Sequence, residues 1–276
     1  MPTSTDTNIS MLHDIVYGLS EQVDAILSTY KNKHYEQKTD VEAISQCMLQ
    51  MAYEKMMSVV TLLNNGADII VDGVLQNIPS FFSQYPIVRS LYELMSIHHS
   101  LFVNPKSAEE AQILLDLWKI KGYKLRVKYT NVHQYEEQKA REIKEIESLT
   151  DKIKKNSIYM ICKEQIEHAI KTDKVGYFEF ATKNCKYSLQ TTSFGEQLLF
   201  NRIFKDLDGM PNIDNDMVYN LLSMNSHPTF LSVLQFGTQS SMDTEQVLLP
   251  LKSATFFVYR MIKSHEYLLH NPIFHK

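Results

Sequence analysis

The fold class is decided by a stretch that runs from residue 39 to residue 66 and reads TDVEAISQCMLQMAYEKMMSVVTLLNNG. Thr39 precedes Glu42 by three positions, the spacing of a capping box, in which the two side chains bond free amides of a first helical turn. The stretch ends on Asn65-Gly66, a typical helix stop. Between these signals, apolar residues recur every three or four positions, which predicts one buried helix face. The predicted face comprises Met48, Met51, Tyr53, Met56, Val59, Val60 and Leu63.

Similar start and stop signals recur along the rest of the chain, so we predict an all-α fold, a multi-helix bundle with a long charged helix near the middle. The stretch 172–192 stays ambiguous, because Val175–Phe180 fits a short strand or a turn of helix. The expected helices span residues 8–31, 40–65, 80–103, 107–130, 132–171, 193–207, 214–226 and 243–270.

The expected organisation is an N-terminal helix within residues 1–39 and a helical bundle domain over 40–270. The bundle domain contains a charged helical arm at about 132–171, where the stretch 134–156 is dense in Glu and Lys. Such a helix can pack along one edge of the bundle with its charges in water. Alternatively, it protrudes and meets a partner protein or a second copy of the chain.

Composition excludes several classes of protein. The formal net charge of −4 gives no global basic field for non-specific binding of nucleic acid. Only eight of 276 residues are glycine, and no phosphate-binding glycine loop is present. The three cysteines form no CxxC pair, and no apolar run approaches ~20 residues. We therefore expect a cytoplasmic protein that does not cross a membrane and uses no metal or cofactor.

A first polar stripe, Arg89 and Glu93, interrupts the apolar helix predicted over 80–103. Residues four apart lie on one helix face, so these two side chains are spaced to pair. The apolar arc around them is broad, which predicts that protein surrounds most of this helix. We therefore expect the pair to be mutually satisfied in or beside the core, where removal of one partner costs about 3–5 kcal/mol.

A second polar stripe, again at steps of four, consists of Tyr219, Ser223 and His227. Pro228 disfavours helical backbone at the residue before it, so the helix is expected to end just before His227. A short helix over 229–235 is expected to follow. His227 would then lie at a break between two elements, and we expect the two stripes to meet in one pocket.

The motif Arg-x-x-x-Glu followed by Tyr-x-x-x-Ser-x-x-x-His-Pro resembles an uncharacterised bacterial family of all-helical proteins of unknown function. That family is loosely similar to the HEPN proteins, named for higher eukaryotes and prokaryotes nucleotide-binding. The resemblance covers about residues 40–270 and implies a helical bundle but no established reaction. It also implies that a set of motif side chains converges, namely Arg89, Glu93, Tyr219, Ser223 and His227.

Many HEPN proteins are metal-independent ribonucleases that carry an Arg, four to six further residues and then a His, and usually act across a dimer. Arg260 and His265 have this spacing on the predicted C-terminal helix. The resemblance implies His265 as general acid and base and Arg260 as the group that stabilises phosphate charge. The alternative is that both are surface residues of an amphipathic helix.

Two functional hypotheses follow. Only the first makes the protein an enzyme, and both stay open. The first is an HEPN-like effector that acts on RNA or nucleotides without a metal, in phage defence or a toxin system. The second is a non-catalytic binding or scaffold protein. In that case the polar cluster fixes helix register, and the charged helix docks a protein partner or a second copy of the chain.

Overall fold

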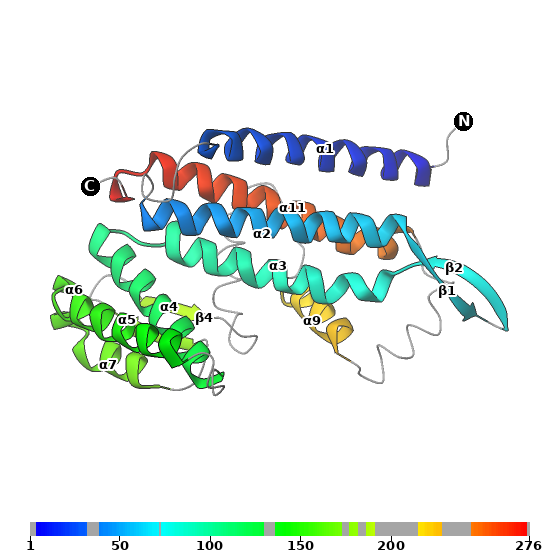
Figure 1. The fold of residues 1–276 in the computed structure, drawn as a ribbon. Coiled ribbons are helices and arrows are strands. Elements are labelled where there is room, and N and C mark those ends of the chain that lie inside the picture. Colours follow the sequence, from blue (N-terminus) through cyan, green and yellow to red (C-terminus); the bar gives the residue numbers. More distant parts are fainter. Residues whose placement is uncertain are drawn as a thin grey trace. The chain divides into compact units, whose positions relative to one another are not determined.

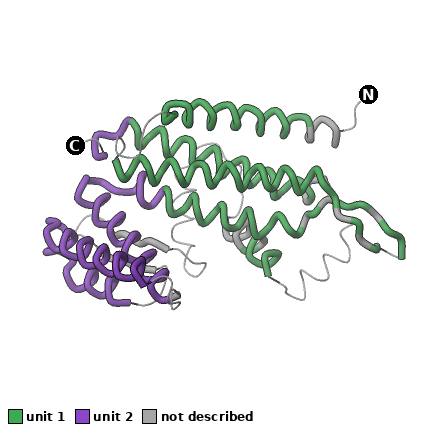
Figure 2. The backbone as a smooth tube through the Cα atoms, in the orientation of Figure 1, with its two compact units in different colours: residues 1–98, 200–269 green, residues 99–199, 270–276 purple. Residues whose placement is uncertain are grey.

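The fold is all-α, as predicted: helices are joined by loops and two short β-hairpins (Figure 1). The computed structural model describes residues 4–31, 39–71, 73–129, 136–172, 177–181, 186–190, 215–227 and 244–274. The chain forms two compact units (Figure 2). Unit 1 comprises residues 1–98 and 200–269, and unit 2 comprises residues 99–199 and 270–276. The predicted boundary at residue 39 falls inside unit 1, because the N-terminal helix packs there against its neighbours.

Unit 1 is a bundle whose long helices run alongside one another (Figure 1). Its helices are α1 (Ser4–Tyr30), α2 (Asp40–Asn64), most of α3 (Phe81–Phe102), α9 (Asn215–Ser226) and nearly all of α11 (Thr244–His270). The Tyr92 and Phe257 rings, whose centroids lie 5.6 Å apart, join α3 to α11. Fully buried apolar side chains fill the centre of the bundle, among them Leu49, Met56, Leu91, Met95 and Val258.

Helix α2 begins as its sequence predicts. The Thr39 hydroxyl accepts a hydrogen bond from the Glu42 amide at 3.2 Å, and the Glu42 carboxylate accepts one from the Thr39 amide at 3.0 Å. Of the predicted face, Met48, Met56 and Val59 are buried, Tyr53, Val60 and Leu63 are half-buried, and Met51 is 48% exposed. Ser45 occupies the buried face instead, and this polar residue proves important below.

A hairpin that sequence analysis did not predict joins α2 to α3. Strands β1 (Gly66–Val71) and β2 (Val74–Pro79) pair antiparallel, and the two residues between them are Asp72-Gly73. This dipeptide between apolar residues is a strong hairpin signal, and Gly73 has the positive φ of 77° that such turns need. Gly66, expected to be only a helix stop, starts β1 instead, where a Cβ atom would lie 2.0 Å from Asn77 Oδ1.

Unit 2 is built around α4 (Ala108–Tyr129) and α5 (Glu136–Lys154), which pack on each other. The predicted long charged helix is not continuous. It is divided into α5, α6 (Ser157–Ile161) and α7 (Lys163–Lys171), because the side chain of Asn156 caps a new helix by accepting from the Ile158 amide. Helix α5 is not a free arm, since it packs on α4, its Leu149 and Ile153 are buried, and its Glu142 pairs with Arg126 of α4.

The ambiguous stretch 172–192 contains a second hairpin, β3 (Tyr177–Ala181) paired antiparallel with β4 (Lys186–Gln190). The unit also contains the short helix η4 (Pro272–Phe274). The helices predicted over 193–207 and 229–235 lie outside the described residues. Among the residues that the structure does describe, no helix has both the length and the apolar character to cross a membrane.

Candidate functional site

The first polar stripe forms an ion pair on α3. Arg89 Nε lies 3.3 Å from Glu93 Oε1, and the two side chains are 12% and 26% exposed. The pair therefore lies at the edge of the core of unit 1, partly covered and partly accessible. Burial raises the pKa of Glu93 above its ordinary value, and the positive charges of Arg89 and Lys55 oppose that rise.

His227, at the C-terminal end of the second stripe, contacts Arg89 of the first stripe. Arg89 Nη1 lies 2.7 Å from Nε2 of His227, although the two residues are 138 positions apart in the chain. Guanidinium nitrogens only donate hydrogen bonds, so His227 Nε2 accepts here. The imidazole is therefore neutral in this contact, and its proton is on Nδ1. His227 itself is exposed and follows directly on the last residue of α9.

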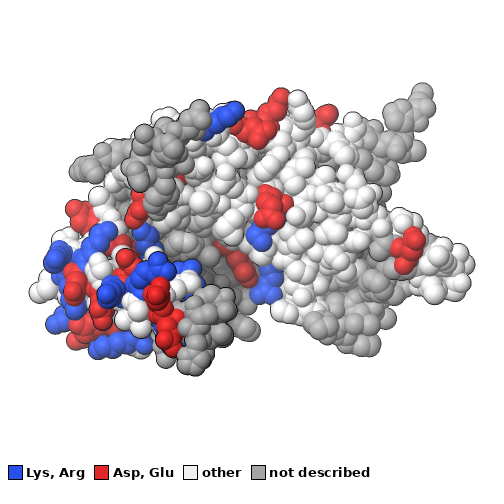
Figure 3. Space-filling model, viewed as in Figure 1, with Lys and Arg blue, Asp and Glu red and all other residues white. Residues whose placement is uncertain are grey.

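A second positively charged side chain acts on the Arg89–Glu93 pair. Lys55 of α2 donates a hydrogen bond to the Ser90 hydroxyl at 3.0 Å, next to Arg89 in the chain. Its charge acts on the Glu93 carboxylate. Arg89, Lys55 and Glu93 together carry one net positive charge. Charged groups are sparse on the visible face of unit 1, whereas unit 2 is crowded with both signs (Figure 3).

The remaining members of the predicted cluster are less defined. Ser223 is half-buried on α9, one turn before His227. Tyr219 lies on the same helix, but its side chain is outside the described residues. The two stripes are joined through Arg89, which contacts both Glu93 and His227. We name these three residues, together with Lys55, the arginine–histidine site.

A separate series of hydrogen-bonded polar side chains lies in the interior of unit 1. The Tyr30 hydroxyl lies 3.1 Å from His265 Nε2, and Ser45 Oγ lies 2.7 Å from His265 Nδ1 and 2.7 Å from His98 Nε2. These side chains come from α1, α11, α2 and α3, and none is more than 5% exposed. Because each neutral imidazole has one donor and one acceptor, the four groups can bond in series without any charge.

The structure does not favour the Arg260 and His265 pair as a reaction centre. Five residues rotate a helix by about 140°, so the two side chains leave α11 in different directions. His265 is fully buried and both ring nitrogens are engaged, whereas Arg260 is half-buried. Burial lowers the pKa of His265 to about 4, against a weaker opposing effect of Glu42 and Glu266. A substrate could not reach this imidazole without opening the bundle.

Sequence analysis missed Tyr30, Ser45, His98 and Lys55. Ser45 had the clearest signal, because it is a polar residue on the apolar face of a strongly periodic helix. His98 gave no comparable signal in the sequence. Lys55 gave no signal either, because a lysine at the edge of a buried helix face is common. Among the described residues, no group of three or more His, Cys, Asp or Glu side chains is placed to hold a metal ion.

The chain was compared with models of known families. The model of a family of unknown function, DUF5677, matches residues 42–244, which is most of the chain. The chain belongs to DUF5677. The match confirms the expected membership in an uncharacterised domain family, and the DUF5677 region contains the whole arginine–histidine site. Tyr30, Arg260 and His265 lie outside it. No curated protein and no solved structure matches the chain.

Proposed function

We propose that the arginine–histidine site binds an RNA phosphodiester and promotes its cleavage without a metal ion. The observation that carries the proposal is the 2.7 Å contact between Arg89 Nη1 and His227 Nε2 at an accessible edge of the bundle. It joins a fixed positive charge to a neutral imidazole, the two groups that phosphoryl chemistry at neutral pH needs. The loose likeness to HEPN proteins adds a setting, namely phage defence or a toxin system in a bacterial cytoplasm.

The chemistry requires Arg89 to exchange partners. When a phosphate approaches, its oxygens accept from the guanidinium, and His227 Nε2 is released. His227 Nε2 then takes the proton of the ribose 2′-hydroxyl, whose oxygen attacks phosphorus. The P–O5′ bond breaks, and the leaving oxygen takes a proton from water. The products are a 2′,3′-cyclic phosphate and a 5′-hydroxyl end, and His227 returns its proton to solvent.

Glu93 and Lys55 support this arrangement in different ways. Glu93 holds Arg89 through Nε, so the Nη atoms of the guanidinium point away from that contact. Lys55 adds a second positive charge beside Glu93, which favours an anionic substrate over a neutral one. Electrostatic binding of this kind weakens as salt rises.

The test is incubation of purified protein with RNA in the presence of a chelator. We expect fragments with cyclic phosphate ends, and we expect His227→Ala and Arg89→Lys to lower their rate by about a hundredfold. His13→Ala is the matched control, because His13 is an exposed histidine on α1. If wild-type protein leaves RNA intact, or if His227→Ala cleaves as fast as His13→Ala, the proposed activity is wrong.

A scaffold role is the second candidate, and one observation favours it. The Arg89–His227 contact joins α3 to the end of α9, so it would hold α9 in place without any chemistry. In that case His227→Ala would lower thermal stability, and wild-type protein would show no cleavage at any concentration.

A further inference from the structure

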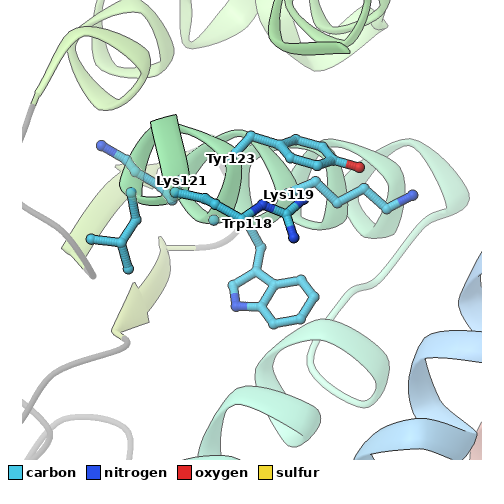
Figure 4. Close-up of a pocket in the computed structure, with 7 residues that line it drawn as sticks. Trp118, Lys119, Lys121 and Tyr123 are labelled. Atoms are coloured by element: carbon cyan, nitrogen blue, oxygen red, sulfur yellow. The ribbon is translucent and has the colours of Figure 1, made fainter. Parts of the chain in front are cut away.

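A hollow of about 360 Å³ opens on α4 in unit 2, and nothing above gives it a role. This volume is within the range of about 300–1,000 Å³ typical of small-molecule sites. Every described residue that lines it comes from α4 (Figure 4). The lining comprises Trp118, Lys119, Lys121, Gly122, Tyr123, Leu125 and Arg126. We name it the α4 hollow.

Gly122 makes the hollow possible. At about 100° per residue, Gly122 falls between Trp118 on one side of the helix and Tyr123 on the other, and Figure 4 shows these two rings on opposite sides of α4. An added Cβ atom at Gly122 would meet nothing within 4 Å. Space is therefore available over the helix where any larger residue would project.

The lining combines flat aromatic groups with positive charge. Lys119, Lys121 and Arg126 line the hollow, and no acidic side chain is among its described lining residues. Two of the cations are held in position. Lys121 Nζ donates to the Thr172 carbonyl at 2.6 Å, and Arg126 Nε lies 2.5 Å from Glu142 Oε1.

Arg126 also lies over the ring of Tyr123, with its guanidinium carbon 5.7 Å from the ring centre. This stacking and the Glu142 pair orient the guanidinium plane at the rim of the hollow. A ligand that meets side chains already oriented loses less conformational entropy on binding than one that must order them.

We propose that the α4 hollow binds a flat aromatic ring that carries a phosphate group, the chemistry of a nucleotide. The ring lies over Gly122 against the indole of Trp118, and the phosphate is held by the surrounding cations. Stacking on an aromatic side chain accepts any base, since every base has a π-face. A phosphomonoester carries nearly two negative charges at neutral pH, which suits a site with several cations better than a neutral or singly charged group does.

The chain provides a direct readout, because Trp118 is its single tryptophan. Stacking of a base on the indole changes tryptophan fluorescence, with no background from another site. We expect adenosine 5′-monophosphate to quench this fluorescence saturably. Adenosine, which lacks the charge, and ribose 5-phosphate, which lacks the ring, should each bind at least tenfold more weakly. No saturable quenching by the monophosphate, or equal affinity for adenosine, would overturn the proposal.

Gly122→Leu is the decisive variant. The leucine projects into the hollow from a position where an added Cβ atom meets nothing within 4 Å, and leucine is a better helix former than glycine, so folding should be preserved. Quenching should be lost. Gly18→Leu is the matched control, because Gly18 is a glycine of α1 that also has nothing within 4 Å of an added Cβ atom. Quenching that persists in Gly122→Leu would place the ligand elsewhere and refute the site.

Two sources could supply this ligand, a free mononucleotide or a nucleotide within an RNA strand. A short oligoadenylate titrated beside the monophosphate separates them, because a strand that uses the hollow binds more tightly than its monomer. The proposal is independent of the activity of the arginine–histidine site. Binding is measured with His227→Ala protein, in which any cleavage of RNA is about a hundredfold slower, so failure of either proposal leaves the other testable.

Discussion

The hydroxyl oxygen of Ser45, on α2, lies 2.7 Å from Nδ1 of His265, on α11, across 220 positions of the chain. The same oxygen lies 2.7 Å from Nε2 of His98, on α3. A hydroxyl has one proton to donate and two lone pairs that accept, so Ser45 can donate to one imidazole and accept from the other. One small side chain thus bonds one ring nitrogen of each of two buried histidines and joins three helices.

Ser45→Ala should therefore destabilise the protein far more than its size suggests. The alanine leaves a buried ring nitrogen of His98 and one of His265 without this partner, at about 1–3 kcal/mol each. Urea unfolding should show a loss of about 2–6 kcal/mol in the free energy of unfolding. Ser58→Ala is the control on the same helix, because the Ser58 hydroxyl bonds only the Glu54 carbonyl one turn away. Equal effects of the two variants would contradict the role of Ser45.

Stability should fall in mild acid because of His265. Its pKa is lowered from 6.5 to about 4 by burial, so the unfolded chain binds this proton more tightly than the folded protein does. The stabilising contribution is complete above pH 6.5 and is lost as the pH falls towards 4, by about 3 kcal/mol in all. Unfolding in urea at a series of pH values measures this loss. In His265→Gln the slope between pH 6.5 and 4 should be shallower, and an unchanged slope would assign the acid sensitivity to other groups.

Arg89→Ala should lower the melting temperature more than Arg141→Ala does. The first variant leaves Glu93, a half-buried carboxylate whose pKa burial already raises, without its ion-pair partner, at about 2 kcal/mol. Arg141 is exposed on α5, and exposed substitutions usually change stability by less than about 0.5 kcal/mol. Arg126 would be a poor control, because its partner Glu142 has a side chain only 5% exposed. Differential scanning calorimetry measures the melting temperatures of Arg89→Ala and Arg141→Ala. Equal values would mean that Arg89 contributes nothing to stability.

The β1–β2 hairpin should be sensitive at its two glycines for different reasons. Gly73→Ala places a side chain at a φ of 77°, which strains the turn by about 1 kcal/mol. Gly66→Ala collides with the Asn77 side chain, which is itself held by Asp68 at 2.8 Å. Amide hydrogen exchange should speed up across β1 and β2 in both variants. Protection unchanged in both would contradict the register described above.

Helix positions could be predicted because their causes are local. The Thr39 capping box and the helix stop at Asn65 act over one turn of the helix. The spacing of apolar side chains can be read directly from the order of residues. The β1–β2 hairpin was equally local and was missed, since the Asp72-Gly73 signal was not used. The break at Asn156 was also local, but an asparagine in a charged helical stretch is common and only its capping bond marks the new start.

Contacts between residues far apart in the chain depend on how the helices pack. The sequence pattern indicated that Arg89 and His227 belong to polar stripes, but only the packing of α9 near α3 determined the bond between them. The same holds for Ser45, His98 and His265, whose neighbours in the chain carry no sign of the partner. The sequence alone determined which segments coil and which face of each is apolar, because backbone hydrogen bonds and side-chain period act within a few residues. The tertiary structure decided which polar groups meet, because a buried donor or acceptor is satisfied by whichever helix packs against it.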